Sequence, residues 1–168
     1  MRQVEGVPDH YFDKLEPKEF SHTDAKKFVD NTGAVIKHHP TQAFFSPLED
    51  NIGMPDLNQF NTEEDYFSTI FHELIHWTGH KDRLDRIKVG AGWGTKEYRI
   101  EELVAEMGSA FLCGYFNFNA DLQHTAYINH YIEALKSDAT IVRTAAAAAT
   151  NAFNHLMDLQ PTPLEIAA

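Results

Sequence analysis

Hydrophobic residues follow two different periodicities along the chain. Before Asn61 they gather in short runs bounded by proline or glycine, and after it they recur every three or four residues. Short apolar runs of the first kind are typical of strands, and the longer pattern is typical of amphipathic helices. The chain is therefore predicted to place a small sheet before a set of helices.

The N-terminal part begins with a short helix. Phe20, Ala25 and Phe28 have helical spacing, and Gly33 is suited to the left-handed conformation that ends many helices. We expect a small sheet after it, antiparallel or mixed. Its strands are predicted at 34–39, 42–47 and 50–55, the last of them as an edge strand.

Four helices are predicted after the sheet. The first starts behind a capping box of Asn61 and Glu64 and ends at Gly79, and the second starts at the N-cap Thr95 and ends at Gly114. The other two are predicted at 121–138 and 139–159, and the alanine run 145–149 in the last indicates close helix packing. Strands followed by helices favour the α+β class, with a C-terminal helical bundle.

Composition restricts the cellular setting and the partners. The 168 residues, 43% of them hydrophobic, are the usual size of one domain, and we expect residues 1–168 to form a single one. A formal charge of −11 makes nucleic acid an unlikely partner. The single cysteine, Cys113, and the lack of any long apolar run predict a cytoplasmic protein that does not contact membrane.

The stretch "FHELIHWTGH" holds the clearest chemical signal. Residues four apart share a helix face, so His72 and His76 can present two imidazoles to one ion while Glu73 projects beside them. Two neutral imidazoles and one carboxylate are a ligand set for a single Zn²⁺ that leaves a position open for water. Glu73 is then placed to take a proton from that water as a general base.

Two residues are the main candidates for the third protein ligand of the metal. Glu102 lies on the second long helix, with Glu106 one turn later to accept a hydrogen bond from a zinc-bound histidine, and we favour this pair. In the alternative, Gly79 turns the chain sharply and Asp82 returns to the metal. His80 is a weaker candidate, and its position just past a helix end favours a solvated residue.

Several segments resemble the metallopeptidase domain of ArdC-type plasmid antirestriction proteins and phage polyvalent proteins. They occur in the family's order and together cover about residues 40–160. The segments are "DNIGMP", "YFSTIFHELIHWTGHKDRL", "EYRIEELVAEMGSAFLC", "HTAYINHYIEALKSD" and the alanine-rich last helix.

The resemblance implies a zincin-like fold of the gluzincin kind. His72, His76 and Glu102 match the metal-ligand positions, and Glu73 matches the catalytic acid/base. The resemblance also implies a mobile-element setting, in which such proteins blunt restriction of incoming DNA. The resemblance also implies that full-length antirestriction proteins carry an N-terminal single-stranded-DNA-binding domain, which we do not expect within residues 1–168, and DNA binding is therefore not expected of this chain.

Three further polar residues have two interpretations each. His124 and Tyr127 lie nearly one turn apart in a stretch that matches the family, and they could stabilise an oxyanion opposite the zinc. They could equally anchor helices by hydrogen bonds. Tyr98, just before the glutamate motif, has the same two interpretations. In contrast, Arg83 and Arg86 are expected to pair with nearby acids rather than with phosphate.

Three functions follow from these residues. The first is a zinc metallopeptidase that hydrolyses a peptide or protein substrate. The second is a non-catalytic binding module that blocks a host restriction or defence protein. The third is a structural metal site closed by His80 or Asp82 as the fourth ligand. We rank them in that order.

Overall fold

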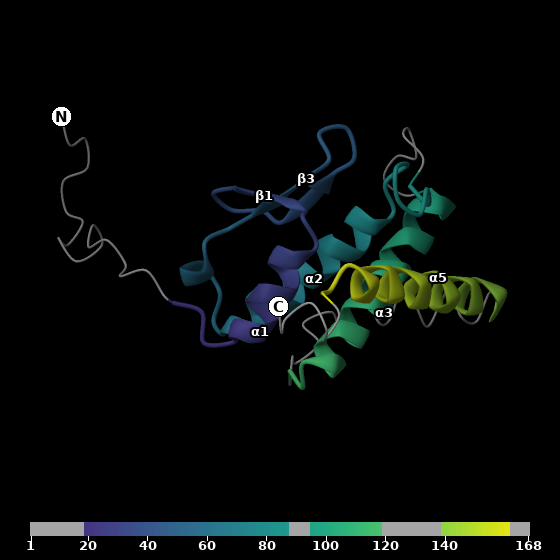
Figure 1. The fold of residues 1–168 in the computed structure, drawn as a ribbon. Helices are drawn as coiled ribbons and strands as arrows, with labels where there is room; N and C mark the ends of the chain where they lie inside the picture. Colours follow the sequence, from purple (N-terminus) through teal and green to yellow (C-terminus); the bar gives the residue numbers. More distant parts are fainter. Residues whose placement is uncertain (1–18, 88–94, 119–138, 162–168) are drawn as a thin grey trace, which may run out of the picture.

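The computed structural model describes residues 19–87, 95–118 and 139–161. Figure 1 shows a small sheet on one side of α2, with α3 and α5 packed on the other. The elements are α1 (Thr23–Asn31), β1 (Val35–His38), β2 (Phe44–Ser46), β3 (Asn51–Met54), the 3₁₀ turn η2 (Leu57–Gln59), α2 (Glu63–Thr78), α3 (Lys96–Tyr115) and α5 (Ala139–Asp158).

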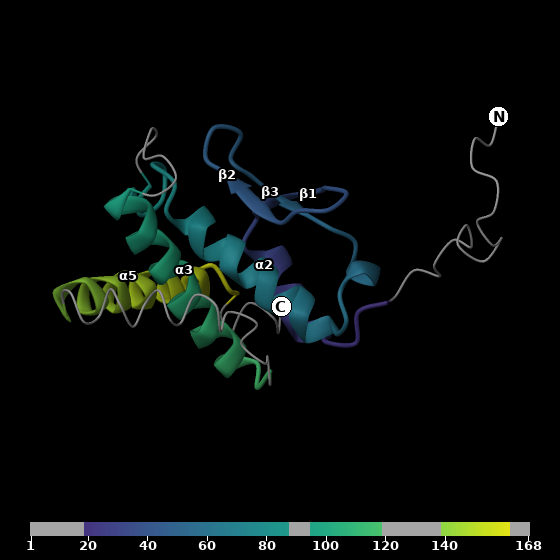
Figure 2. The ribbon, with the colours of Figure 1, turned by 180° about the vertical axis from the view of Figure 1, so that it is seen from behind.

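The sheet is mixed, with strand order β1-β3-β2. β3 runs parallel to β1 and antiparallel to β2, and Phe45 of β2 lies opposite Ile52 of β3. The prediction that 50–55 forms an edge strand is wrong, because β3 is paired on both sides and all four of its residues are buried. Its uncharged sequence suits a central strand, and β1 and β2 form the two edges (Figure 2).

Helix α2 is the centre of the core. Phe67, Phe71 and Leu74 are fully buried along it, and the sheet and α3 both contact it. Its capping box is formed by Thr62 and Asp65, one residue later than the sequence suggests. The glutamate of the expected box, Glu64, instead places its carboxylate 3.1 Å from the His22 ring.

Most helix ends lie where the sequence places them. Gly33 has φ +72° after α1, α2 ends at Thr78 before Gly79, and Thr95 accepts a hydrogen bond at the start of α3. The predicted end of α3 is two residues short, because Gly114, expected just past the helix, and Tyr115 are both helical. A left-handed residue follows the helix only at Asn117, with φ 55°.

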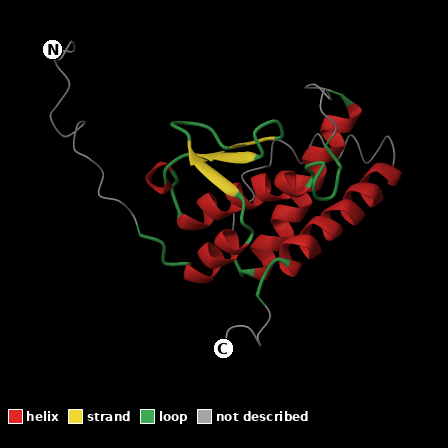
Figure 3. Ribbon diagram, turned by 45° about the horizontal axis from the view of Figure 1, so that its top comes forward, coloured by secondary structure: helices red, strands yellow, loops and turns green. Residues whose placement is uncertain are grey.

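The helical layer is closely packed. Ala145, Ala149 and Ala152 of α5 are fully buried, which confirms the close packing predicted for the alanine run. The predicted helix at 121–138 lies outside the described residues. Figure 3 shows the described helices packed together on one side of the strands. Within the part of the chain that the structure describes, no helix is long and apolar enough to span a membrane.

Gly108 and Gly114 of α3 provide a matched test of this packing. A Cβ added at Gly108 would lie 2.6 Å from Ile75 Cδ1 and 2.7 Å from its Cγ1, whereas one at Gly114 would meet nothing within 4 Å. Overpacking costs about 1–3 kcal/mol, and the helix propensity of alanine returns at most about 1 kcal/mol. In urea titrations of the metal-free protein, Gly108→Ala should destabilise and Gly114→Ala should stabilise. Equal effects would contradict the close contact.

Candidate metal centre

Two helices bring three potential ligands together. His72 and His76 project from α2, and Glu102 projects from α3, which packs against it. The two Nε2 atoms are 3.2 Å apart, and the Glu102 carboxylate oxygens lie 3.6 Å from His72 Nε2 and 3.5 Å from His76 Nε2. All three donor atoms lie within 4.8 Å of one another.

These separations suit a shared ion. Two ligand atoms bound to one tetrahedral Zn²⁺ at about 2.1 Å are about 3.4 Å apart. The two Nε2 atoms are 3.2 Å apart, and each lies 3.5–3.6 Å from a different oxygen of Glu102, Oε2 for His72 and Oε1 for His76, so each contact is close to that value. The donor set of two imidazoles and one carboxylate therefore fits a divalent metal in both chemistry and spacing.

Each histidine has a different carboxylate near its Nδ1 atom, the ring nitrogen that does not face the proposed ion. His72 Nδ1 lies 3.6 Å from Glu106, and His76 Nδ1 lies 3.3 Å from Glu101. The helical spacing predicted Glu106 for this role and did not predict Glu101. Adjacent residues on a helix point about 100° apart, so the pair Glu101-Glu102 can serve two different histidines.

The charged groups around the ligand cluster favour binding of a cation there. Burial opposes ionisation of Glu101 and Glu102, but His76 and Arg86 lower the pKa of the Glu101 carboxyl. The two histidines lower the pKa of the Glu102 carboxyl. Burial likewise opposes protonation of His76, yet the hydrogen bond to Glu101 and the neighbouring carboxylates raise its pKa in the metal-free protein. A buried site that draws a proton onto an imidazole also attracts a metal ion.

Glu73 lies beside the ligand cluster with a distinct environment. Its residue is only 8% exposed, and burial raises its pKa against the opposing influence of His76 and His72. The backbone N–H of Phe45 in β2 donates a hydrogen bond to it. This contact places the β2 edge of the sheet next to the cluster.

The rival ligand Asp82 lies apart from the cluster. Its side chain is 72% exposed and its carboxylate is 3.6 Å from His80 Nδ1. His80 is buried, and the expectation of a solvated residue is therefore wrong. The chain folds back after α2, with Ile87 N–H donating to Gly79 O at 2.9 Å, and His80 comes to lie edge-on to the Phe45 ring.

A family model described as zincin-like metallopeptidase matches residues 23–148 of the chain. The chain belongs to this family. The match confirms the family resemblance and, with the similar solved structures, the α+β zincin-like fold.

Two relatives of this chain come from bacteria. A DNA primase TraC of Escherichia coli is 38% identical over 150 residues, which cover 86% of this chain and 14% of that protein. An uncharacterized protein y4eC of Sinorhizobium fredii is 35% identical over 127 residues, which cover 74% of this chain and 41% of that one.

Two solved structures of the antirestriction protein ArdC from plasmid R388 share the fold at 34% identity. The Mn(II)-bound structure has a TM-score of 0.73 and covers 92% of this chain and 58% of ArdC, and the metal-free structure has a TM-score of 0.69. The zincin-like chain thus spans less than two thirds of these relatives.

His124 and Tyr127, which were expected to stabilise an oxyanion, lie outside the described residues. Tyr98 can be placed, and its side chain forms a hydrogen bond with the carboxylate of Glu102, which lowers the pKa of that carboxyl. In this zincin-like domain Tyr98 therefore contacts the ligand set.

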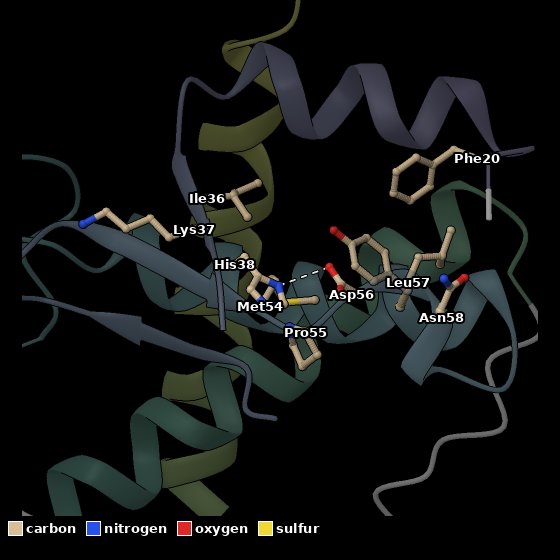
Figure 4. Close-up of a pocket in the computed structure, with 10 residues that line it drawn as sticks. Phe20, Ile36, Lys37, His38, Met54, Pro55, Asp56, Leu57 and Asn58 are labelled. Carbon is tan, nitrogen blue, oxygen red and sulfur yellow. Dashed lines mark ion pairs between the residues drawn. The ribbon is translucent and has the colours of Figure 1, made fainter. Parts of the chain in front are cut away.

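A hollow of about 530 Å³ lies at the other edge of the sheet, beside β1 (Figure 4). His38 and Asp56 form an exposed ion pair there, with 3.1 Å between His38 Nδ1 and Asp56 Oδ1. None of the candidate ligands lines this hollow.

Ionisation of Glu73 should make the metal-free protein less stable at neutral pH. Its pKa is raised above the ordinary 4.5, so the folded state is penalised as pH rises above that value. Glu73→Gln removes the penalty and should raise the free energy of unfolding at pH 7, with the gain vanishing at about pH 4. Urea titrations at both pH values check this, and a gain that is equal at both would contradict it.

Proposed function

We propose that this chain is a zinc-dependent peptidase domain in which His72, His76 and Glu102 hold the ion. The main support is that the three side chains converge, with one donor atom of each within 4.8 Å of the others, as ligands of a single ion must. The exposed Asp82 would have to leave solvent and cross to the histidines to replace Glu102.

Zinc is the ion we assign, because two imidazoles and one carboxylate are the ligand set of many catalytic zinc sites. Related ArdC has been solved with Mn(II), and the same donors also accept manganese. When bound, the ion acts as a Lewis acid and lowers the pKa of water in its open position.

Glu73 is the proposed general base. Its carboxylate is buried beside the two imidazoles, and burial raises its pKa, which makes the carboxylate a stronger proton acceptor. It takes a proton from the attacking water and returns one to the leaving amine. His72 and His76 act through neutral imidazoles whose Nδ1 atoms face Glu106 and Glu101.

The substrate proposed for the site is an extended peptide added to the β2 edge. β2 is paired with β3 on one side, and on its other side Phe45 N–H reaches Glu73. A peptide that pairs with this edge by backbone hydrogen bonds would pass directly beside the ligand cluster.

The biological setting we propose is antirestriction on a mobile element, because the related ArdC is an antirestriction protein of a plasmid. The substrate would then be a protein of the host's restriction or defence machinery. The acidic chain, with formal charge −11, gives no reason to assign nucleic acid binding to this part.

Glu73→Gln tests the peptidase directly. The substitution keeps the size of the side chain but removes the proton acceptor, so turnover of a fluorogenic peptide library by the zinc-loaded protein should fall about 10²–10⁴-fold. Zinc content, measured by elemental analysis, should remain that of the unsubstituted protein because Glu73 is not a ligand.

The control is Glu64→Gln on the same helix, which should leave turnover unchanged. Each protein is also tested for protection of a transferred plasmid against restriction. Loss of protection in Glu73→Gln supports peptide hydrolysis as the antirestriction activity. Full protection by that variant would contradict it and favour the non-catalytic binding module.

A further inference from the structure

Two arginines in the turn after α2 fold back onto that helix. Arg83 donates to Trp77 O at 2.5 Å, and Arg86 donates to Ile75 O at 2.8 Å. Each also forms a two-point contact with one carboxylate: Arg83 with Asp50, and Arg86 with Glu101. The two residues have the same kind of structural role and differ in the carboxylate they hold.

The partner of Arg86 contacts the ligand cluster. Arg86 Nε and Nη2 donate to the two oxygens of Glu101 at 3.1 and 2.9 Å, and Glu101 Oε1 lies 3.3 Å from His76 Nδ1. Arg86 Nη1 also donates to Thr78 Oγ1 at 3.0 Å. The guanidinium is thus tied to the last turn of α2 and to α3 together.

This arrangement specifies how His76 presents its ring. A carboxylate held by a guanidinium can only accept hydrogen bonds, so His76 Nδ1 must carry the hydrogen that points to Glu101. The lone pair of the neutral ring is then on Nε2, the atom that lies 3.2 Å from His72 Nε2 and 3.5 Å from Glu102.

We propose that Arg86 is a positioning residue that, through Glu101, fixes the tautomer and orientation of His76 for metal binding. The inference rests on the proposed metal site. Arg86 reaches the ligand across only one intermediate side chain, and both partners of that ion pair are largely buried, with side chains 14% and 15% exposed. Removing the guanidinium would leave the Glu101 carboxylate buried without its fixed partner.

The experiment measures the zinc dissociation constant of Arg86→Met by competition with a chromophoric chelator. Loss of an outer partner of a metal-bound histidine typically weakens metal binding about 10–100-fold, and we expect a loss in that range. Arg86→Lys should recover only part of the affinity, because an ammonium cannot reproduce the two-point contact. The visible absorption of the cobalt-loaded protein should change along with the affinity.

Arg83→Met is the matched control. Arg83 is equally buried, with a side chain 12% exposed, and its guanidinium lies 3.8 Å over the Trp77 ring, but its carboxylate partner is Asp50. Both arginine variants should lower the free energy of unfolding of the metal-free protein, whereas only Arg86→Met should weaken zinc binding. Equal zinc affinity in the two variants would overturn the inference.

Glu101→Gln, alone and combined with Arg86→Met, tests the route of the effect. If Arg86 acts through Glu101, the second substitution should add little to the first, and additive losses of affinity would overturn the proposal. If Arg86→Met fails to fold, Glu101→Gln alone still tests the inference. This variant should bind zinc more weakly than the unsubstituted protein, and an unchanged zinc affinity would overturn the inference. If the unsubstituted protein binds no zinc, the proposed function itself fails.

Discussion

The close approach of α2 and α3 is the contact on which the rest of the structure depends. Gly108 has no side chain, and the space that a Cβ would fill is occupied by Ile75 of α2. Ile75 is next to His76, and Glu101 lies two helical turns before Gly108 on the same face of α3. The helix separation set at this contact is therefore the one at which the glutamates of α3 reach the histidines of α2.

The same packing buries several charged groups at the site, and this lowers the stability of the metal-free fold. The cluster holds the carboxylates of Glu73, Glu101, Glu102 and Glu106 around two imidazoles, and Arg86 is a cation that offsets part of this charge. Carboxylates at a buried site repel one another and lose hydration, and a bound divalent cation would relieve both effects. Helix α2 combines an apolar face in the core with this charged face, and its buried residues therefore include the ionisable Glu73 and His76 beside Leu74 and Ile75.

The local structure was predictable where one side chain determines it. The left-handed Gly33, the N-cap Thr95 and the spacing of His72 and His76 each act over a few residues, and the structure places them as the pattern predicts. The order of the strands was not predictable, because it depends on which neighbours β3 pairs with across the sheet. Its lack of charged residues was the available sign of a central strand.

In the candidate site, too, some residues were predictable from the sequence and others were not. The helical spacing pointed to Glu102 and Glu106, which the structure brings to the two histidines, although their role as ligand and support stays a prediction. Glu101 and the Arg86 that holds it could not be found from spacing, because their contact joins α3 to the turn after α2. The burial of His80 depends on the same fold-back of the chain, which no local pattern encodes.

The most direct test of the metal site is a crystal structure of the zinc-loaded protein with anomalous diffraction collected at the zinc edge. We predict one anomalous peak bound by Nε2 of His72, Nε2 of His76 and a carboxylate oxygen of Glu102, with one position left to water. A peak coordinated by Asp82 or His80, or an ion enclosed by four protein ligands, would contradict the account.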